Sequence, residues 1–140
     1  FIPYIIESTV GCDRTVLAIL DNAYTVETLE NGETREVMKF KPFLAPYKVA
    51  VLPLAKKYHS EKANEVYSML SKYFMTSYDE AGSIGKRYRR ADASGTPFCV
   101  TIDEETLKNN TVTVRDRDTM EQITLKLDEL VNYIEERVRF

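Results

Sequence analysis

The feature that most constrains the fold is a continuous apolar run at residues 49–54, which reads Val-Ala-Val-Leu-Pro-Leu. The run lacks the alternation of polar and apolar residues that marks a strand with one face in water. It is typical of a central strand that is covered on both faces. Such a strand needs helices on both sides of its sheet, so we expect helices and strands to alternate from residue 48 onward.

The segments after this run fit that expectation. Apolar residues recur at helical spacing from Ala63 to Phe74, and Ser60 is expected to cap this helix. Short strands are predicted at residues 76–78, 98–102, 111–115 and 122–126. Two further helices are predicted, one over residues 83–94 behind a cap at Ser83 and one after a cap at Asp128. This order predicts an α/β fold with a mixed β-sheet flanked by helices.

The first 45 residues are predicted to be organised differently. Residues 1–24 are predicted to form a strand at 4–6 and then a helix. Because this helix is apolar on most sides, we expect other parts of the protein to cover it. Residues 25–45 read as a connector, with a hairpin turn at Asn31-Gly32 and a break in regular structure from Pro42. We place the domain boundary there, so that the main domain spans residues 46–140.

The composition is that of a globular protein that can bury a core. The chain has 140 residues, 44% of them hydrophobic, and a formal net charge of −3. No apolar run approaches the roughly 20 residues of a membrane span, and the start has neither an initiator Met nor the basic region of a signal peptide. We expect a piece cut from a longer, cytoplasmic chain.

The cysteine and histidine content argues against a metal site. Cys12 and Cys99 are far apart and lack CxxC partners, so we expect them to be reduced, buried thiols. The lone His59 cannot build a histidine zinc site and leaves little material for a catalytic triad.

A basic segment at residues 82–92 stands out in this acidic chain. Four cations lie within five of its residues: Lys86, Arg87, Arg89 and Arg90. Its apolar residues share one helical stripe that should face the sheet: Ile84, Tyr88 and Ala91. Two interpretations stay open, a solvated helix face or contact with a polyanion such as a phosphate backbone. Glycines at positions 82 and 85 favour the second, because they let an anion approach the helix N-terminus. A Walker A loop is excluded, because Glu80 stands where that motif needs Gly.

Charges alternate at a predicted strand end, in Arg115-Asp116-Arg117-Asp118. By strand periodicity Arg115 and Arg117 share one face, and Asp116 lies on the other. One interpretation is a set of cross-strand ion pairs at a hairpin. The other is an edge that reads bases, because Arg supplies forked donors and Asp supplies acceptors.

The chain as a whole resembles the C-terminal part of the class II glycyl-tRNA synthetases. The resemblance is carried by collinear segments at residues 3–7, 11–15, 44–54, 82–90, 95–101 and 115–120. They include Pro-Tyr-Ile-Ile-Glu, Gly-Cys-Asp-Arg-Thr and Gly-Ser-Ile-Gly-Lys-Arg-Tyr. The last of these favours the glycine enzyme over other synthetases that have the same domain.

The resemblance implies roles for the N-terminal residues. Residues 1–24 would be motif 3, the last strand and helix of the catalytic domain. Arg14 would be the catalytic arginine that holds ATP phosphates, with Gly11 also at the ATP site. Glu7 would bind the ammonium group of glycine. Thr9 stands where the family usually has a serine, and its extra methyl would enter a pocket built for the smallest amino acid.

The resemblance also implies that residues 46–140 are the anticodon-binding domain. Phosphate contacts and base readers are expected among its charged side chains: Lys86, Arg87 and Arg90 on phosphates, and Arg115, Asp116 and Arg117 at bases.

The implied full-length protein is a homodimeric, cytoplasmic glycine–tRNA ligase that joins glycine to ATP and then to tRNA(Gly), with Mg²⁺ present. This chain alone would bind no metal or cofactor and would be inactive, and neither membrane nor DNA is an expected partner. One alternative is a non-catalytic nucleic-acid-binding accessory subunit, of the mitochondrial DNA polymerase type. The intact Glu7, Gly11 and Arg14 argue against it. A prolyl-, threonyl- or histidyl-type anticodon domain fits the basic helix less well.

Overall fold

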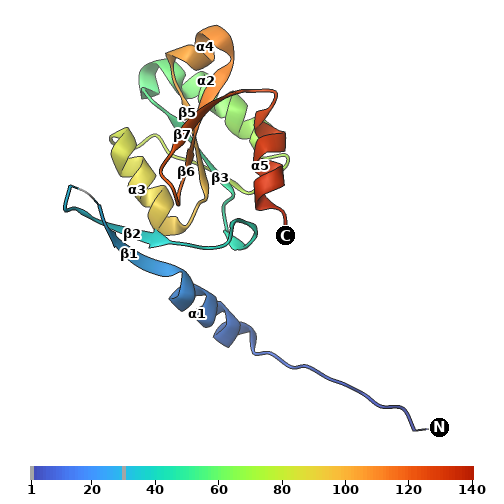
Figure 1. The fold of residues 1–140 in the computed structure, drawn as a ribbon. Coiled ribbons are helices and arrows are strands. Elements are labelled where there is room, and N and C mark those ends of the chain that lie inside the picture. Colours follow the sequence, from blue (N-terminus) through green and yellow to red (C-terminus); the bar gives the residue numbers. More distant parts are fainter. Residues whose placement is uncertain (1, 30) are drawn as a thin grey trace.

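The computed structural model describes residues 2–29 and 31–140. The chain forms a five-stranded sheet with helices, a two-stranded hairpin packed against that layered part, and an N-terminal helix and tail that project from it (Figure 1). The prediction of an α/β fold with a mixed sheet flanked by helices is confirmed. None of the described helices is long and apolar enough to cross a membrane.

The sheet has the strand order β4-β3-β5-β6-β7. Its strands are β3 (Val49–Pro53), β4 (Thr76–Tyr78), β5 (Phe98–Ile102), β6 (Thr111–Asp116) and β7 (Gln122–Lys126). The strand β3 pairs in parallel with β4 and β5, while β5–β6 and β6–β7 are antiparallel. All five residues of β3 are buried, as the apolar run predicts.

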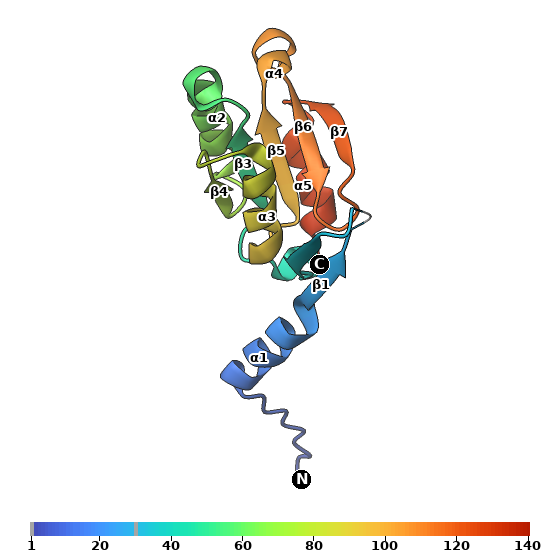
Figure 2. The same cartoon turned by 90° about the vertical axis from the view of Figure 1, so that its left-hand side faces the viewer.

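Helices cover the two faces of the sheet unequally. The larger core packs α2 (Lys56–Leu70) and α5 (Leu130–Val138) on one face, where Val51, Val100, Leu70 and Ile134 belong to a single buried cluster. The helix α3 (Ile84–Ser94) packs on the opposite face, over β3 and β5. Figure 2 shows α3 in front of the sheet and α5 behind it. On the α3 side, β6 and β7 are therefore left with an exposed surface.

Helix starts differ from the predictions in two places. The helix α2 begins at Lys56, because Nδ1 of the buried His59 accepts a hydrogen bond from the backbone N–H of Ala55 at 3.0 Å. Ser60 therefore lies inside the helix and not at its cap. The short α4 (Glu104–Asn109) was not predicted, although Asp103 and Thr106 form a reciprocal capping box at its start.

Two of the three predicted caps lie at or next to the observed positions. Ser83 is the N-cap of α3 but makes no capping hydrogen bond through its side chain, and Glu129, not Asp128, precedes α5.

The N-terminal region matches the prediction only in part. The helix α1 (Cys12–Ala23) is present, and most of its residues are exposed, including Cys12, which was expected to be buried. The strand predicted at residues 4–6 is absent, and residues 2–10 have no regular structure. A strand needs a neighbour for its backbone hydrogen bonds, and among the described residues none pairs with this segment.

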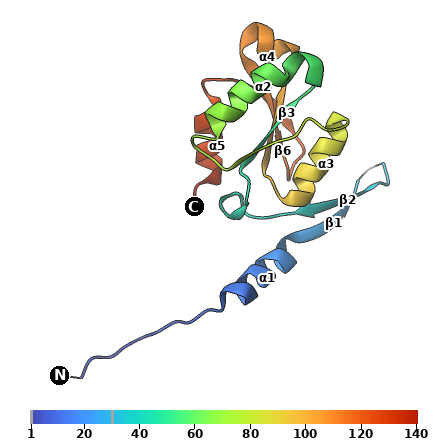
Figure 3. The same cartoon turned by 180° about the vertical axis from the view of Figure 1, so that it is seen from behind.

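The predicted hairpin is confirmed as β1 (Tyr24–Thr28) and β2 (Thr34–Met38), which are antiparallel. Gly32 in the turn has φ = +81°, a conformation that glycine adopts without strain. A short 3-10 helix, η1 (Pro42–Leu44), then leads into the sheet. Figure 3 shows the hairpin beneath α3, away from α5.

A buried ionic cluster fastens this hairpin to the sheet and to α3. Arg35 of β2 and Arg115 of β6 both donate to the carboxylate of Asp92 on α3, at 3.2 and 2.8 Å, and all three side chains are at least 92% removed from solvent. Arg35 also donates to the backbone oxygen of Arg117 at 3.0 Å and to Glu27. The hydrogen bond from Lys39 is the largest cause of a lowered pKa at Glu27, although partial burial opposes it.

We predict that Asp92→Asn destabilises the chain by about 3–5 kcal/mol, because it leaves the buried guanidinium group of Arg115 without a carboxylate and removes one of the two carboxylates that pair with Arg35. Urea unfolding followed by circular dichroism measures this loss. The matched control is Glu135→Gln, which removes an exposed i,i+4 pair with Arg139 and should cost less than about 1 kcal/mol. Equal losses in the two variants would contradict a central role for the cluster.

We predict that only one of the two thiols reacts in the native protein. Cys12 is exposed, whereas burial raises the pKa of Cys99 to about 12. A thiol reagent should therefore modify one group in buffer and two in denaturant.

The raised pKa of Cys99 also has a consequence for stability. Above about pH 8.5 the unfolded chain releases the thiol proton while the folded chain keeps it, so stability falls as pH rises from there toward 12. Comparing unfolding at pH 8 and 10 in wild type and Cys99→Ala isolates this contribution, which the variant should lack.

Candidate nucleic-acid interface

The basic helix α3 buries the stripe that the sequence predicts. Ala91 packs with Ala50, Leu52 and Cys99 of the sheet, and Ile84 and Tyr88 lie against the same cluster. Tyr88 Oη lies 2.7 Å from Thr101 Oγ1. The predicted orientation of α3 is therefore confirmed, and it decides which of the basic side chains can reach solvent.

Arg87 does not lie on the surface as expected. Its side chain is buried and donates to two backbone oxygens, that of Pro53 at the end of β3 and that of Gly82 at 2.7 Å. Pro53 is the last residue of β3 and Gly82 lies in the loop before α3, and sequence periodicity could not bring either acceptor next to this side chain. This buried position argues against a phosphate contact for Arg87. Its side chain instead links the end of β3 to the start of α3 through hydrogen bonds.

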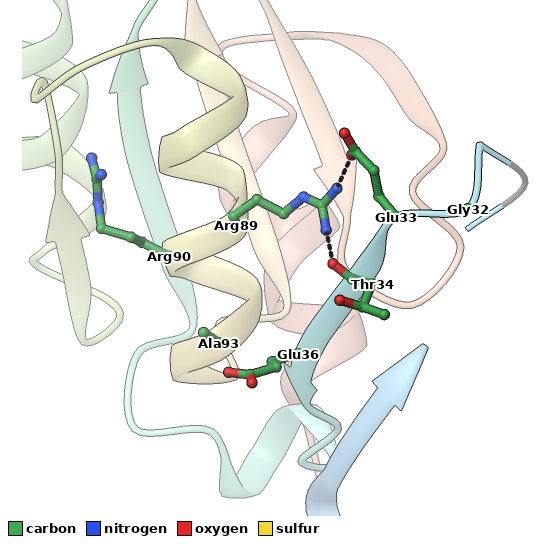
Figure 4. A pocket seen from close by; sticks show the side chains of 7 residues that line it. All are labelled: Gly32, Glu33, Thr34, Glu36, Arg89, Arg90 and Ala93. Atoms are coloured by element: carbon green, nitrogen blue, oxygen red, sulfur yellow. Dashed lines mark hydrogen bonds and ion pairs between the residues drawn. The ribbon is translucent and has the colours of Figure 1, made fainter. Parts of the chain in front are cut away.

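The other three cations of α3 are accessible to different degrees. Lys86 is exposed. Arg90 extends toward Asp79, where its Nε donates to Oδ2 at 2.8 Å, and also donates to the backbone oxygen of Ala81. Arg89 points the opposite way, toward the hairpin (Figure 4). The predicted phosphate contacts Lys86 and Arg90 thus remain on the surface, and Arg90 shares its charge with a carboxylate.

Arg115 was expected to read bases at the surface, but its side chain is buried. Both of its terminal nitrogens donate to Asp92, at 2.8 and 3.1 Å, and its guanidinium carbon lies 4.8 Å from the ring centre of Tyr88. Burial lowers the pKa of Arg115, but the hydrogen bond and charge of Asp92 outweigh this effect, so the pKa is raised. The ion-pair interpretation of this segment holds for Arg115, with a partner on a helix and not on a neighbouring strand.

Arg117 is buried as well and holds backbone oxygens. Its guanidinium donates to the carbonyl oxygens of Gly95 at 2.9 Å, Phe40 at 2.7 Å and Met38 at 3.1 Å, and to the carboxylate of Asp118. The placement of both arginines disagrees with direct base reading.

Asp116 shapes the turn after β6. Its Oδ1 accepts hydrogen bonds from the backbone N–H groups of Asp118 at 2.7 Å and Thr119 at 3.1 Å. One carboxylate oxygen of Asp116 is thus used to stabilise the loop between β6 and β7.

An exposed polar face on β6 and β7 was missed in the sequence analysis. The residues on the α3 side of these strands are paired in register as Thr113 with Thr124, Thr111 with Lys126, and Arg115 with Gln122. Gln122, Thr124 and Lys126 are exposed, and the two threonines of β6 are half-buried. The signal that could have revealed this face is the alternation of polar and apolar residues along 122–126.

The predicted catalytic residues are not brought together. Glu7 and Thr9 are exposed in the irregular segment before α1, Gly11 is the N-cap of α1, and Arg14 is exposed in its first turn. Among residues 2–29 and 31–140, no group of three His, Cys, Asp or Glu side chains could hold a metal ion.

Comparison with known proteins identifies aminoacyl-tRNA synthetases as relatives of this chain. The glycine–tRNA ligase of Clostridium tetani is 58% identical over all 140 residues, and that of Geobacillus kaustophilus is 55% identical. The chain spans about 30% of the length of each of these relatives. The crystal structure of the RNA binding domain of threonyl-tRNA synthetase from Cryptosporidium parvum matches with a TM-score of 0.65 and 29% identity, over 71% of this chain and 25% of that one.

The resemblance to glycyl-tRNA synthetases is thus confirmed by relatives that match the chain from end to end. Residues 48–137 also match the family model described as anticodon binding domain. This match includes the whole five-stranded sheet and covers well over half of the sequence. The chain therefore belongs to the anticodon binding domain family of the aminoacyl-tRNA synthetases.

Proposed function

We propose that this chain is the anticodon-binding part of a glycine–tRNA ligase and that it binds the anticodon stem-loop of tRNA(Gly). The observation that carries the proposal is the exposed polar face of β6 and β7, on the same side of the sheet as the basic helix α3. The relatives bear the name glycine–tRNA ligase, which favours the ligase over a polymerase accessory subunit. Their identity of 58–59% also favours the glycine enzyme over a threonyl-type domain, whose solved relative shares 29%.

The chemistry of the polar face suits unpaired bases. Hydroxyl and amide groups both donate and accept hydrogen bonds, which allows them to read the edges of bases in a single-stranded loop. Gln122 and Thr124 present such groups to solvent, and Lys126 adds a positive charge on the same strand. We propose that this face reads the bases and that Arg115 and Arg117 stabilise its position.

Phosphate binding falls to the exposed cations of α3. Lys86 has an exposed side chain and is the first choice, while Arg90 must share its charge with Asp79. Contacts of this kind are independent of sequence and depend on salt.

The remaining proposals concern the full-length protein. We propose that it is a cytoplasmic homodimer that joins the carboxylate of glycine to the α-phosphate of ATP with release of pyrophosphate, and then transfers glycine to tRNA with release of AMP. Arg14 would offset the negative charge that develops on the phosphates, near Gly11, and Glu7 would bind the glycine ammonium beside Thr9. Mg²⁺ is expected with ATP in the full-length protein.

We predict that base readers and phosphate contacts respond differently to substitution. Gln122→Ala should cost about 1–3 kcal/mol of binding to a stem-loop with the glycine anticodon, and little for one whose anticodon bases are exchanged. Lys86→Ala should weaken both stem-loops alike and reduce the salt slope by about one. Fluorescence anisotropy with labelled stem-loops at several salt concentrations measures both effects.

The control for charge is Lys72→Ala. Lys72 is exposed just after α2, which packs on the opposite face of the sheet, so its loss should leave binding within about twofold of wild type. If wild type fails to distinguish the two stem-loops, the proposed function is wrong. If Lys72→Ala and Lys86→Ala weaken binding equally, the assignment to α3 is wrong.

In the full-length protein we predict that Arg14→Ala lowers the turnover of glycine-dependent pyrophosphate exchange on the order of 100-fold, because one positive charge at the reacting phosphates is lost. Binding of the anticodon stem-loop should be unchanged, which separates this effect from misfolding. Robust pyrophosphate release from the 140-residue chain alone would contradict the assignment of catalysis to the longer protein.

A further inference from the structure

A groove lined in part by charged side chains runs between the hairpin and α3. One hollow of about 810 Å³ is lined by Glu33, Glu36, Arg89 and Ala93, among others (Figure 4). A second hollow of about 530 Å³ continues along the N-terminal half of α3 and adds Lys86. Both hollows are lined by Glu33, Arg89 and Arg90, and we treat them as one groove, called here the hairpin groove.

The two walls of the hairpin groove carry opposite charges. The helix wall presents Lys86 and Arg89, which are one turn apart on α3 and both accessible to solvent. The hairpin wall presents Glu33, which directly precedes β2, and Glu36 within β2. The cations of the helix wall suit a ligand with negative charge.

Arg89 is occupied in the free protein. Its Nη2 donates to Glu33 Oε2 at 3.1 Å, and its Nη1 donates to the backbone oxygen of Thr34 at 3.0 Å. The ion pair is exposed, with 38% of the Arg89 side chain and 66% of the Glu33 side chain in contact with solvent. Exposed pairs of this kind contribute little to stability, so another anion can replace Glu33 at small cost.

We propose that the hairpin groove binds the sugar–phosphate backbone of RNA, that Arg89 is its phosphate ligand, and that Glu33 competes with the RNA for Arg89. The proposal rests on the proposed function and names a contact that the sequence analysis did not assign. A phosphate matches the guanidinium fork in two parallel hydrogen bonds.

The test compares two carboxylates of the same groove. Glu33→Gln removes the competitor of Arg89, whereas Glu36→Gln removes the same charge from the same wall without a contact to Arg89. Labelled stem-loops with the glycine anticodon and with exchanged bases are titrated with each variant of the chain. We expect Glu33→Gln to tighten binding of both stem-loops by up to about fivefold and to steepen the salt slope, and Glu36→Gln to change it by less than about twofold.

A double variant provides the second readout. Arg89→Gln should weaken both stem-loops by about five- to tenfold, and adding Glu33→Gln to it should bring no further gain. The proposal is overturned if Glu33→Gln and Glu36→Gln tighten binding equally, if Glu33→Gln leaves binding unchanged, or if its gain persists without Arg89. If wild type binds neither stem-loop, the proposed function fails as well. If wild type binds and discriminates but Glu33→Gln has no effect, only the groove assignment fails.

Discussion

The structure depends on one buried carboxylate. Asp92 has no exposed surface and lies between the guanidinium groups of Arg35 and Arg115, so it joins the hairpin, α3 and β6 at a single point. Removing three charges from water is costly, and this cost is offset only when each charge has its partner in good geometry. The cluster therefore tolerates little displacement of the three elements. As a result, the hairpin groove and the polar face of β6 and β7 are held in one rigid frame.

The basic segment divides into side chains with different tasks, and a count of charges cannot reveal this. Arg87 is buried against the end of β3, Arg90 is held by Asp79, Arg89 is held by Glu33, and Lys86 is exposed. The partners come from three separate segments of the chain. The stripe of Ile84, Tyr88 and Ala91 follows from helical periodicity alone, whereas burial of a cation depends on tertiary neighbours. This difference explains why the helix was predicted correctly and the accessibility of its arginines was not.

The same contrast runs through the rest of the molecule. The apolar run of β3 and the Asn31-Gly32 turn are local signals, and both predicted their elements. The strand expected at residues 4–6 requires a pairing partner that the described residues do not supply, and α4 is only six residues long, too short for periodicity to show. Strand alternation correctly placed Arg115 on the face opposite Val114, yet the partner that buries it is Asp92, 23 residues away on a helix.

The charge balance limits how this domain can recognise a polyanion. The formal net charge is −3, and the accessible cations of α3 lie near Glu33, Glu36 and Asp79, which carry an equal number of negative charges. Long-range attraction to a phosphate backbone is therefore weak, and RNA must displace carboxylates to reach the arginines. Few phosphate contacts mean that non-specific binding stays low. Under the proposed function, discrimination then rests on short-range hydrogen bonds between bases and the hydroxyl and amide groups of β6 and β7.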